Sequence, residues 1–400
     1  MYTQQINHNS KAEASYSQDA SAFELSLSYT KILTSWVEIS SSAFDHNIAT
    51  YKTIIGTNTI LGLVIKGNAY GHGMREIAYL ANRNNAIQYF CVAHLAEAVQ
   101  LRSYSVIKPI VVLSKTYADF DVAVELNIDL MADDCNTLQE MNLVALKLKK
   151  KINVHIKVDT GLSRFGCYVE QVPFLIEYAH HLTNINLIGI YSHFSESYKT
   201  NSPFTLQQKN LFYSLIEKYA SSFLLRHIAN TADAITAAHP LTNMVRIGAG
   251  AYGLMVSEIE KTPLALSTIT PIIRWKARIV QIKKVPAKTL VGYDGTFKTD
   301  RETLLATIPV GYYDGYKKEL SNKASVLVNN CYAPIRGLIG MNHITIDITD
   351  ISDVTVGTEV LLTGNASEVT PTTLAAHAGC FNPRQITTSI NPLLKRIIVE

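Results

Sequence analysis

The sequence predicts an α/β protein with an N-terminal (β/α)8 barrel followed by a mostly antiparallel β domain. At 400 residues the chain is long for a single domain, since domains average about 150 residues. Short apolar or β-branched runs alternate with helix-like stretches over residues 60–248, which is typical of a parallel sheet. After about residue 264 apolar and polar residues alternate with a period of two, which is typical of strands with one solvated face.

Eight short runs predict the barrel strands. They are Ile60–Lys66, Gln88–Ala93, Pro109–Leu113, Ile128–Ala132, Ile152–Val158, Asn186–Ser192, Leu224–Ile228 and Met244–Gly248. Most intervals between them can hold a helix, and eight strands within about 200 residues fit a closed barrel. An open doubly wound sheet is the alternative, because periodicity alone does not separate the two. One interval carries a helix-start signal, a capping box formed by Thr205 and Gln208.

The rest of the chain predicts the β domain. The expected strands are Trp275–Ile279, Leu304–Val310, Ala324–Asn329, Ile344–Thr349 and Thr358–Thr363. Asn329 and Asn330 predict a hairpin turn, because asparagine tolerates the positive φ of tight hairpins. Pro263 and Pro271 bracket the junction. We therefore expect a mobile tail over residues 1–35, a barrel over 36–265 and a β domain over 266–400.

Composition and charge exclude several classes of protein. Apolar residues make up 47% of the chain and charged residues 17%, which excludes a mostly disordered chain. With 36 Lys and Arg against 33 Asp and Glu, and no basic run longer than residues 149–151, no nucleic-acid partner is expected. Neither a bilayer-spanning apolar run, nor a disulfide or metal pattern among the five cysteines, nor a signal peptide is present. We expect a cytoplasmic enzyme with a small-molecule substrate.

Polar residues end the predicted barrel strands. They are Lys66, Lys157, Asp159, His193, His227 and Arg246. Barrel active sites are built at these strand ends, so the six residues should converge. At the end of an apolar run, Lys66 would be partly desolvated, which lowers the pKa of an amine and frees it to form a Schiff base. A lysine that only extends its charge to the barrel mouth is the alternative.

The segment Gly248-Ala-Gly-Ala-Tyr-Gly253 has the spelling G-x-G-x-x-G. A dinucleotide-binding fingerprint opens a helix early in a βαβ unit, whereas this segment follows the eighth barrel run. Loops after the seventh and eighth strands of such barrels often bind phosphate through backbone N–H groups. A Schiff-base lysine and a phosphate site in one barrel together suggest pyridoxal 5′-phosphate (PLP).

Eight motifs resemble, in order and spacing, those of alanine racemases, which are PLP-dependent amino-acid racemases of fold type III. The motifs are Lys66-Gly-Asn-Ala-Tyr-Gly-His-Gly73, Lys157-Val-Asp-Thr-Gly-Leu-Ser-Arg-Phe-Gly166, Ser192-His-Phe194, His227-Ile-Ala-Asn-Thr231, Val245-Arg-Ile-Gly248, Val291-Gly-Tyr293, Gly311-Tyr-Tyr-Asp-Gly315 and Gly340-Met341. The resemblance covers residues 36–396. It implies a PLP-binding barrel, a C-terminal β domain and a head-to-tail homodimer in which the partner's C-terminal domain completes each active site.

The resemblance implies two opposed bases. Lys66 would form the internal aldimine and act on one face of the substrate, and Tyr293 of the partner subunit would act on the other. Inversion of a stereocentre requires such a pair, because the Cα proton leaves from one side and returns from the other. His193, near Tyr293 and Arg246, would help a tyrosine of ordinary pKa about 10 to act as a base. The implied reaction interconverts L-alanine and D-alanine through an external aldimine and supplies D-alanine for peptidoglycan.

Further residues would bind cofactor and substrate. Arg246 would contact the pyridine nitrogen and keep it unprotonated, which makes the ring a weaker electron sink. Arg164 would pair with the substrate carboxylate, and Lys157, carbamylated in the family, would orient that arginine. From the second domain, Met341 and Tyr312 would contact the substrate. The other implied cofactor contacts are Tyr70, His193, Asn230, Thr231, Gly248 and Ala249.

The chain departs from the family pattern at three places in the site. Gly67 stands where alanine is usual, and Gly340 and Asn342 flank Met341 where cysteine and aspartate are common, which we interpret as changes of packing. Near the C-terminus the family has a tyrosine that contacts the phosphate and narrows the substrate entrance, and Arg384 stands at that position here. Our hypothesis is that Arg384 supplies the phosphate contact and reshapes the entrance, so that side chains larger than methyl are accepted.

An alanine racemase is the leading interpretation, and a broad-specificity racemase for serine and lysine on the same scaffold is its nearest alternative. A non-catalytic PLP-binding protein of the same barrel type would lack the C-terminal β domain. A barrel decarboxylase would need a cysteine motif in its second domain, and the residues around Cys331 do not supply one.

Overall fold

The structure is a computed structural model, and it describes residues 33–199, 201–235, 240–254 and 268–400. The tail expected over residues 1–35 lies outside these ranges up to residue 32, and so does Pro263 of the expected junction. By their packing, the described residues form two compact units. The barrel unit comprises Ser40–Ile273 and Thr370–Pro392, and the β unit comprises Arg274–Val369, Leu393–Val399 and the described residues up to Ile39.

Eight parallel strands of the described chain form at the eight predicted runs. Their bounds are β2 (Ile60–Val64), β3 (Ile87–Val92), β4 (Ile110–Val112), β5 (Leu130–Ala132), β6 (Ile152–Lys157), β7 (Ile185–Tyr191), β8 (Leu225–His227) and β9 (Met244–Ile247). Most of their residues are buried. Strands covered on both faces need continuous apolar runs, which explains why these segments were recognisable.

The strands close into a ring through two seams. Within the described residues they form two parallel sheets, of order β4-β3-β2-β9 and β5-β6-β7-β8. Single bridges join the sheets, Val111 to Asp129 between β4 and β5, and Asn230 to Arg246 beside β8 and β9. The Val112 N–H donates to the Asp129 carbonyl at 2.9 Å across the first seam. The predicted barrel is therefore confirmed, and the open doubly wound sheet is wrong.

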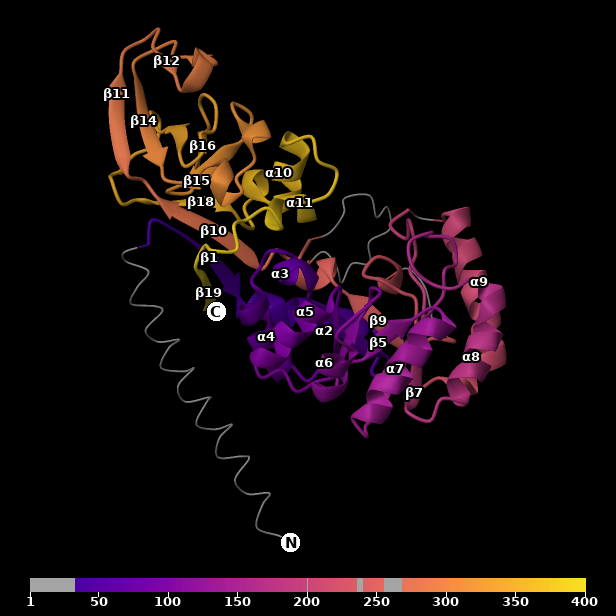
Figure 1. Cartoon of the computed structure of the whole chain (residues 1–400). Coiled ribbons are helices and arrows are strands. Elements are labelled where there is room, and N and C mark those ends of the chain that lie inside the picture. Colours follow the sequence, from indigo (N-terminus) through magenta and orange to yellow (C-terminus); the bar gives the residue numbers. More distant parts are fainter. Residues whose placement is uncertain (1–32, 200, 236–239, 255–267) are drawn as a thin grey trace. The chain divides into compact units, whose positions relative to one another are not determined.

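Helices lie outside the barrel strands (Figure 1). Those described in the barrel unit are α2 (Ser41–Ile55), α3 (Lys66–Tyr70), α4 (Met74–Arg83), α5 (Leu95–Ser103), α6 (Phe120–Glu125), α7 (Cys135–Lys147), α8 (Val172–His180), α9 (Pro203–Tyr219), α10 (Pro371–His377) and α11 (Arg384–Thr387). The capping box predicted at Thr205 is wrong. Helix α9 begins earlier, with Pro203 in its first turn and with Ser202 as the cap that accepts the Thr205 N–H at 3.1 Å.

The β unit is mostly antiparallel, as predicted. Its strands are β1 (Ser35–Ser40), β10 (Ile273–Arg278), β11 (Gln281–Val285), β12 (Leu290–Val291), β13 (Phe297–Lys298), β14 (Thr303–Ile308), β15 (Ser325–Val328), β16 (Cys331–Pro334), β17 (Ile344–Asp347), β18 (Glu359–Thr363) and β19 (Arg396–Val399). A six-stranded sheet has the order β16-β15-β18-β10-β1-β19, and a smaller sheet has the order β11-β14-β17. The predicted hairpin is confirmed: β15 and β16 pair, and Asn329 and Asn330 both have positive φ.

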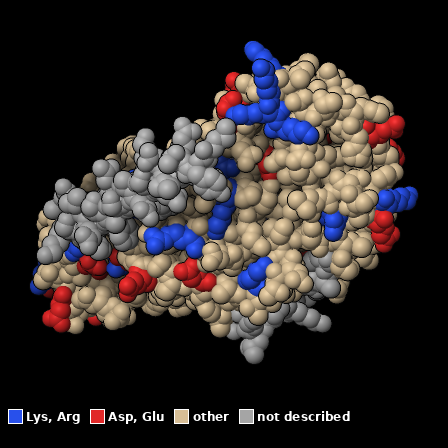
Figure 2. All heavy atoms as spheres, turned by 90° about the horizontal axis from the view of Figure 1, so that it is seen from below, with Lys and Arg blue, Asp and Glu red and all other residues tan. Residues whose placement is uncertain are grey.

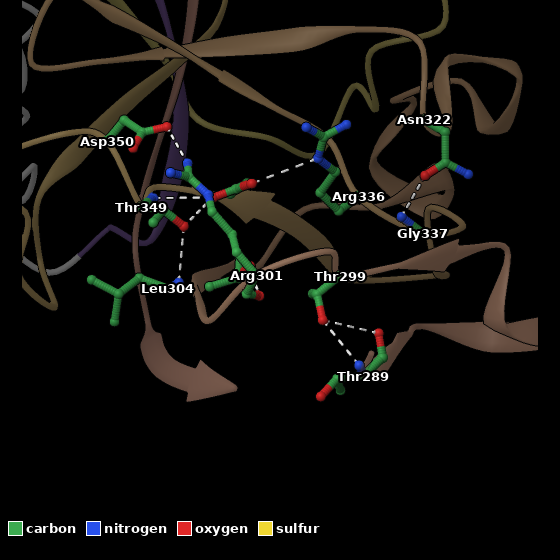
Figure 3. A network of polar contacts seen from close by, with 11 residues as sticks. Thr289, Thr299, Arg301, Leu304, Asn322, Arg336, Gly337, Thr349 and Asp350 are labelled. Carbon is green, nitrogen blue, oxygen red and sulfur yellow. Dashed lines mark hydrogen bonds and ion pairs between the residues drawn. The ribbon is translucent and has the colours of Figure 1, made fainter. Parts of the chain in front are cut away.

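Side-chain hydroxyls hold the ends of strands in the β unit (Figure 3). Thr349 Oγ1 accepts the backbone N–H of Leu304 at 3.0 Å, and Thr299 Oγ1 accepts that of Thr289 at 2.9 Å. Each bond gives a partner to a backbone donor beyond the regular ladder.

Charged side chains are dispersed over the surface. On the face seen in Figure 2, basic and acidic residues are scattered on a mainly uncharged surface, without a large field of one sign. This pattern agrees with the absence of a nucleic-acid footprint from the sequence. Among the described residues, every helix is too short or too polar to cross a bilayer.

Candidate active site

A cavity of about 270 Å³ opens in the barrel unit, and we call it the barrel pocket. Eleven of the fourteen predicted site residues line it, although their roles remain predictions. They are Lys66, Tyr70, Lys157, Arg164, His193, Asn230, Thr231, Arg246, Gly248, Ala249 and Arg384. Most of them follow or end barrel strands, so the topology brings together residues that are remote in sequence.

Lys66 follows β2 and opens the short helix α3. Burial and the nearby Arg164 guanidinium lower the pKa of Lys66, while Glu97 opposes them. The Glu97 carboxylate also holds the backbone, because it accepts the N–H groups of Gly67 at 2.7 Å and of Ala93 at 2.8 Å. Sequence reasoning missed Glu97. Its place at the third position of α5, where a carboxylate can cap a helix, was the available signal.

The backbone after Lys66 turns in the left-handed sense. Gly67, Asn68 and Ala69 have φ of 61°, 52° and 54°, and Tyr70 continues with φ of 55°. Left-handed conformation costs a non-glycine residue roughly 1–2 kcal/mol. A Cβ at Gly67 would have no atom within 4 Å, so the packing interpretation of this glycine is wrong. Glycine removes conformational strain there instead.

Tyr70, Thr231, Gly248 and Ala249 line the pocket with hydroxyl and backbone groups, the kinds of group that bind a phosphate. The Gly248 N–H donates to Thr231 Oγ1 at 3.0 Å. A Cβ at Gly248 would lie 2.5 Å from the Tyr70 hydroxyl oxygen, so only glycine lets the two approach. Ala249 begins a 3₁₀ helix of four residues, Ala249–Tyr252, rather than the long helix of a dinucleotide-binding unit.

The Arg246 guanidinium lines the pocket and is almost fully buried. Its Nη1 donates to His227 Nδ1 at 2.6 Å, and its Nη2 lies 3.1 Å from His193 Nδ1. Burial and the Arg246 charge hold the pKa of His193 well below its ordinary value. His193 is therefore neutral near pH 7. The predicted closeness of His193 and Arg246 is thus present in the structure.

Lys157 and Arg164 occupy another wall. Burial, reinforced by the Arg246 charge, lowers the pKa of Lys157 to about 7. Its ammonium also lies 5.1 Å from the centre of the Tyr191 ring, which sequence reasoning missed although it ends β7. The strand-end residue Asp159 does not line the pocket. Its carboxylate accepts the Gly161 N–H at 2.9 Å and shapes the loop that leads to Arg164.

The lining of the barrel pocket is strongly cationic. Five of its described residues are Lys or Arg and none is Asp or Glu. Cations without a carboxylate partner are costly to bury, so such a cavity is suited to anions. Two anionic groups match this set of cations: the phosphate of a cofactor whose aldehyde can react with Lys66, and the carboxylate of an amino acid. The residues present therefore fit PLP together with an amino acid.

The other three predicted residues lie in the β unit and none of them lines the described pocket. Tyr293, Tyr312 and Met341 are 73%, 45% and 55% exposed. The Tyr312 N–H donates to the Gly340 carbonyl at 3.0 Å, and a Cβ at Gly340 would lie 3.6 Å from the Tyr293 ring. The structure thus gathers these three residues on one surface, which we call the tyrosine face.

Comparisons with known proteins agree with this arrangement. The family description "Alanine racemase, N-terminal domain" matches residues 39–256, and "Alanine racemase, C-terminal domain" matches 272–398. An alanine racemase of Desulfovibrio desulfuricans is 33% identical over 91% of this chain and 98% of its own length. The solved alanine racemase of Clostridium difficile 630 has a TM-score of 0.86 and 28% identity over 92% of this chain and 96% of its own. A histidine racemase from Leuconostoc mesenteroides has a TM-score of 0.84 and 28% identity, over 92% and 98%.

Proposed function

This chain belongs to the alanine racemase family, a family of PLP-dependent isomerases, and from that premise we propose that it interconverts L-alanine and D-alanine with PLP in the barrel pocket. The observation that carries the proposal is the convergence of a desolvated Lys66 with four further cations in a cavity without a lining carboxylate. The product D-alanine would serve peptidoglycan synthesis. The cytoplasmic location stays a prediction.

Different lining residues would bind the phosphate, the pyridine nitrogen and the substrate carboxylate. Tyr70, Asn230, Thr231, Gly248 and Ala249 would hold the phosphate through hydroxyl, amide and backbone donors. Arg246 would face the pyridine nitrogen. When bound, PLP supplies an electron sink that acidifies the Cα–H of an amino acid. Arg164 would grip the substrate carboxylate with its planar fork and so orient the Cα–H bond.

Two bases would move the proton. With its pKa lowered, Lys66 would take or return the Cα proton at its Nζ on one face. Tyr293 of the partner subunit would do so at its phenol oxygen on the other face. The exposure of Tyr293, and of Tyr312 and Met341 beside it, supports a homodimer in which this surface completes the partner's pocket.

Carbamylation of Lys157 is part of the proposal. A carbamate would turn a cation beside Arg164 into an anion and so hold that guanidinium in place. The low pKa of Lys157, about 7, supports it, because only a neutral amine adds to CO₂.

One experiment tests the reaction. Enzyme, PLP and L-alanine are incubated in deuterated water, and Cα deuteration and optical rotation are followed together. Exchange accompanied by loss of optical activity is expected. Exchange that retains configuration, or release of CO₂, would overturn the proposal.

A second candidate function is racemisation of larger amino acids. Arg384 lines the pocket, and its Nε donates to Asn382 Oδ1 at 2.7 Å, which fixes a bulky cation where the family has a tyrosine. The structurally similar histidine racemase supports the idea that this scaffold can serve a larger side chain. Turnover of L-alanine, L-serine, L-lysine and L-histidine would be compared. Strict preference for alanine would exclude this candidate.

A further inference from the structure

A line of polar side chains runs from the barrel pocket into the barrel interior. It begins at Arg246 on β9, passes His227 at the end of β8 and His155 on β6, and ends at Asp129 just before β5. All four are buried, the two histidines completely. His227 Nε2 lies 3.2 Å from His155 Nδ1, and His155 Nε2 lies 3.5 Å from Asp129 Oδ2. We call these four residues the interior relay.

The His155 side chain of the relay occupies space that a side chain at Gly189 would otherwise fill. A Cβ at Gly189, which pairs with His155 across β6 and β7, would lie 2.0 Å from His155 Nδ1. The absence of a side chain at Gly189 therefore admits the imidazole. The Tyr191 ring stacks on His227 with 4.9 Å between centroids and an angle of 4°. These packing contacts restrict the orientation of both imidazole rings independently of their hydrogen bonds.

The direction of each hydrogen bond follows from Arg246. A guanidinium only donates, so His227 Nδ1 must accept and its proton must sit on Nε2. His227 then donates to His155 Nδ1, which leaves the His155 proton on Nε2. That nitrogen makes no hydrogen bond, but it lies 3.5 Å from Asp129 Oδ2, so this last contact is electrostatic. Burial and the Arg246 charge hold the pKa of His227 well below its ordinary value, which keeps that ring neutral. The two hydrogen bonds of the relay therefore both run from the pocket inward, and the remaining His155 N–H is the group nearest the Asp129 carboxylate.

Asp129 is itself held in place. Asn153 Nδ2 donates to its Oδ1 at 2.8 Å, and the Tyr89 hydroxyl donates to its Oδ2. Burial and the Asp129 charge raise the pKa of Tyr89, so the phenol stays a donor. No carboxylate lines the described pocket, so Asp129 is the negative charge that Arg246 reaches through the two imidazoles.

We infer that Asp129 and His155 are positioning residues for Arg246: they set the tautomer of His227 and thereby hold the guanidinium toward the pocket. The alternative tautomer of His227 would aim an N–H at another N–H and push Arg246 away. The expected effect on catalysis rests on the proposed function, in which Arg246 would face the pyridine ring. The expected effect on the histidine tautomers does not.

The test compares Asp129→Asn with Tyr89→Phe in the holoenzyme. Asp129→Asn removes the charge, whereas Tyr89→Phe removes one hydrogen bond to the same carboxylate and leaves the charge and the relay. The readouts are the tautomers of His155 and His227 from ¹⁵N NMR of histidine-labelled enzyme, assigned by His155→Gln and His227→Gln, together with kcat and KM for L-alanine and the visible absorption maximum.

Asp129→Asn is expected to give a mixture of imidazole tautomers, a shifted absorption maximum and a kcat lower by about 10- to 100-fold with little change in KM, the size typical of outer-shell partners. Tyr89→Phe is expected to keep both tautomers and to change kcat by less than about 3-fold. Wild-type tautomers and kcat in Asp129→Asn would overturn the inference. Equal losses in both variants would also overturn it, because carboxylate charge would not be the cause.

The relay remains testable if a variant fails to fold or the proposed function fails. If Asp129→Asn does not fold, Gly189→Ala displaces the His155 ring without removing a polar atom, and the same loss of tautomer order is expected. If the enzyme does not racemise alanine, the tautomers still decide the positioning claim. If it racemises alanine and Asp129→Asn behaves as the wild type, only the positioning claim fails.

Discussion

The barrel pocket and the tyrosine face each carry one of the two predicted bases, and the two bases differ in their surroundings: Lys66 lines a cavity, whereas Tyr293 lies on an exposed surface. In the pocket, Lys66 is desolvated and its pKa is lowered, and Arg246 is nearly inaccessible. On the tyrosine face, Tyr293 is largely exposed, and it is absent from the described lining of the barrel pocket. The pocket is therefore organised by residues of its own unit, whereas the role proposed for the tyrosine face requires a second surface to cover it.

The difference shows where pre-organisation comes from in this fold. Barrel strand ends converge because closure of the ring leaves them no other place, so one chain suffices. The loops of the β unit bring Tyr293, Tyr312 and Met341 together but leave them solvated. The proposed role of Tyr293 as a base therefore depends on assembly with a partner subunit.

Substitutions at the two bases give the largest expected effect. Lys66→Ala should abolish the cofactor's visible absorption band and reduce Cα exchange by about 10⁴-fold or more, because attachment and a base are lost together. Tyr293→Phe should keep the absorption band and reduce racemisation by about 10²- to 10⁴-fold. Spectra and racemisation rates of the two variants measure this contrast. A Lys66→Ala variant with an unchanged band would contradict it.

Mixing the two inactive variants sharpens the comparison. If each site joins one chain's pocket to the partner's tyrosine face, subunit exchange between Lys66→Ala and Tyr293→Phe creates one intact site in each heterodimer. Random exchange should restore roughly a quarter of wild-type activity. Activity after mild unfolding and refolding of an equimolar mixture is measured, with each variant treated alone as the control. No recovery in mixtures that contain heterodimers would show that the site lies within one chain.

The acidity of Lys157 gives a smaller, pH-dependent effect that the exposed region should lack. The pKa of Lys157 is lowered to about 7 by burial, so the neutral amine that adds to CO₂ becomes abundant as pH rises through 7. At a fixed concentration of dissolved ¹³CO₂, the carbamate signal in ¹³C NMR should grow between pH 6 and 8. Lys157→Ala is the control. A signal of equal size in that control would place the carbamate elsewhere.

The smallest expected effects concern backbone strain, and they should be alike in the two units. Gly67 beside the pocket and Gly357 in the β unit both have positive φ, and a Cβ at either would have no atom within 4 Å. Alanine at either position should lower the free energy of unfolding by about 1–2 kcal/mol. Denaturant titration measures both variants. Both variants should racemise alanine at close to the wild-type rate, because alanine is the usual residue of the family at position 67 and a Cβ there meets no other atom. A large loss of activity in either variant would contradict a purely conformational effect.

Much of this arrangement was predictable where a residue's role follows from local sequence. Apolar runs located the eight barrel strands, and the polar residues at their ends located Lys66, His193 and Arg246. The turn at Asn329 followed from backbone preference. Features set by long-range packing were not predictable. His155 lies inside an apolar run and gives no sign that Gly189 opens space for it, and strand β1 finds its neighbours more than two hundred residues away in β10 and β19.

Residues Thr370–Pro392 belong to the barrel unit although they follow the β unit in the sequence. The order of synthesis therefore affects when the barrel unit can be completed. The β unit interrupts the barrel unit after Ile273, and the helix that carries Arg384 follows that interruption. About a hundred residues separate them, which a ribosome needs roughly 5–20 s to translate. The six-stranded sheet of the β unit is also completed late, because β1 is made before its other strands and the neighbouring β19 is made after them. Neither unit therefore has all of its described strands and helices until the segment after Val369 has been made.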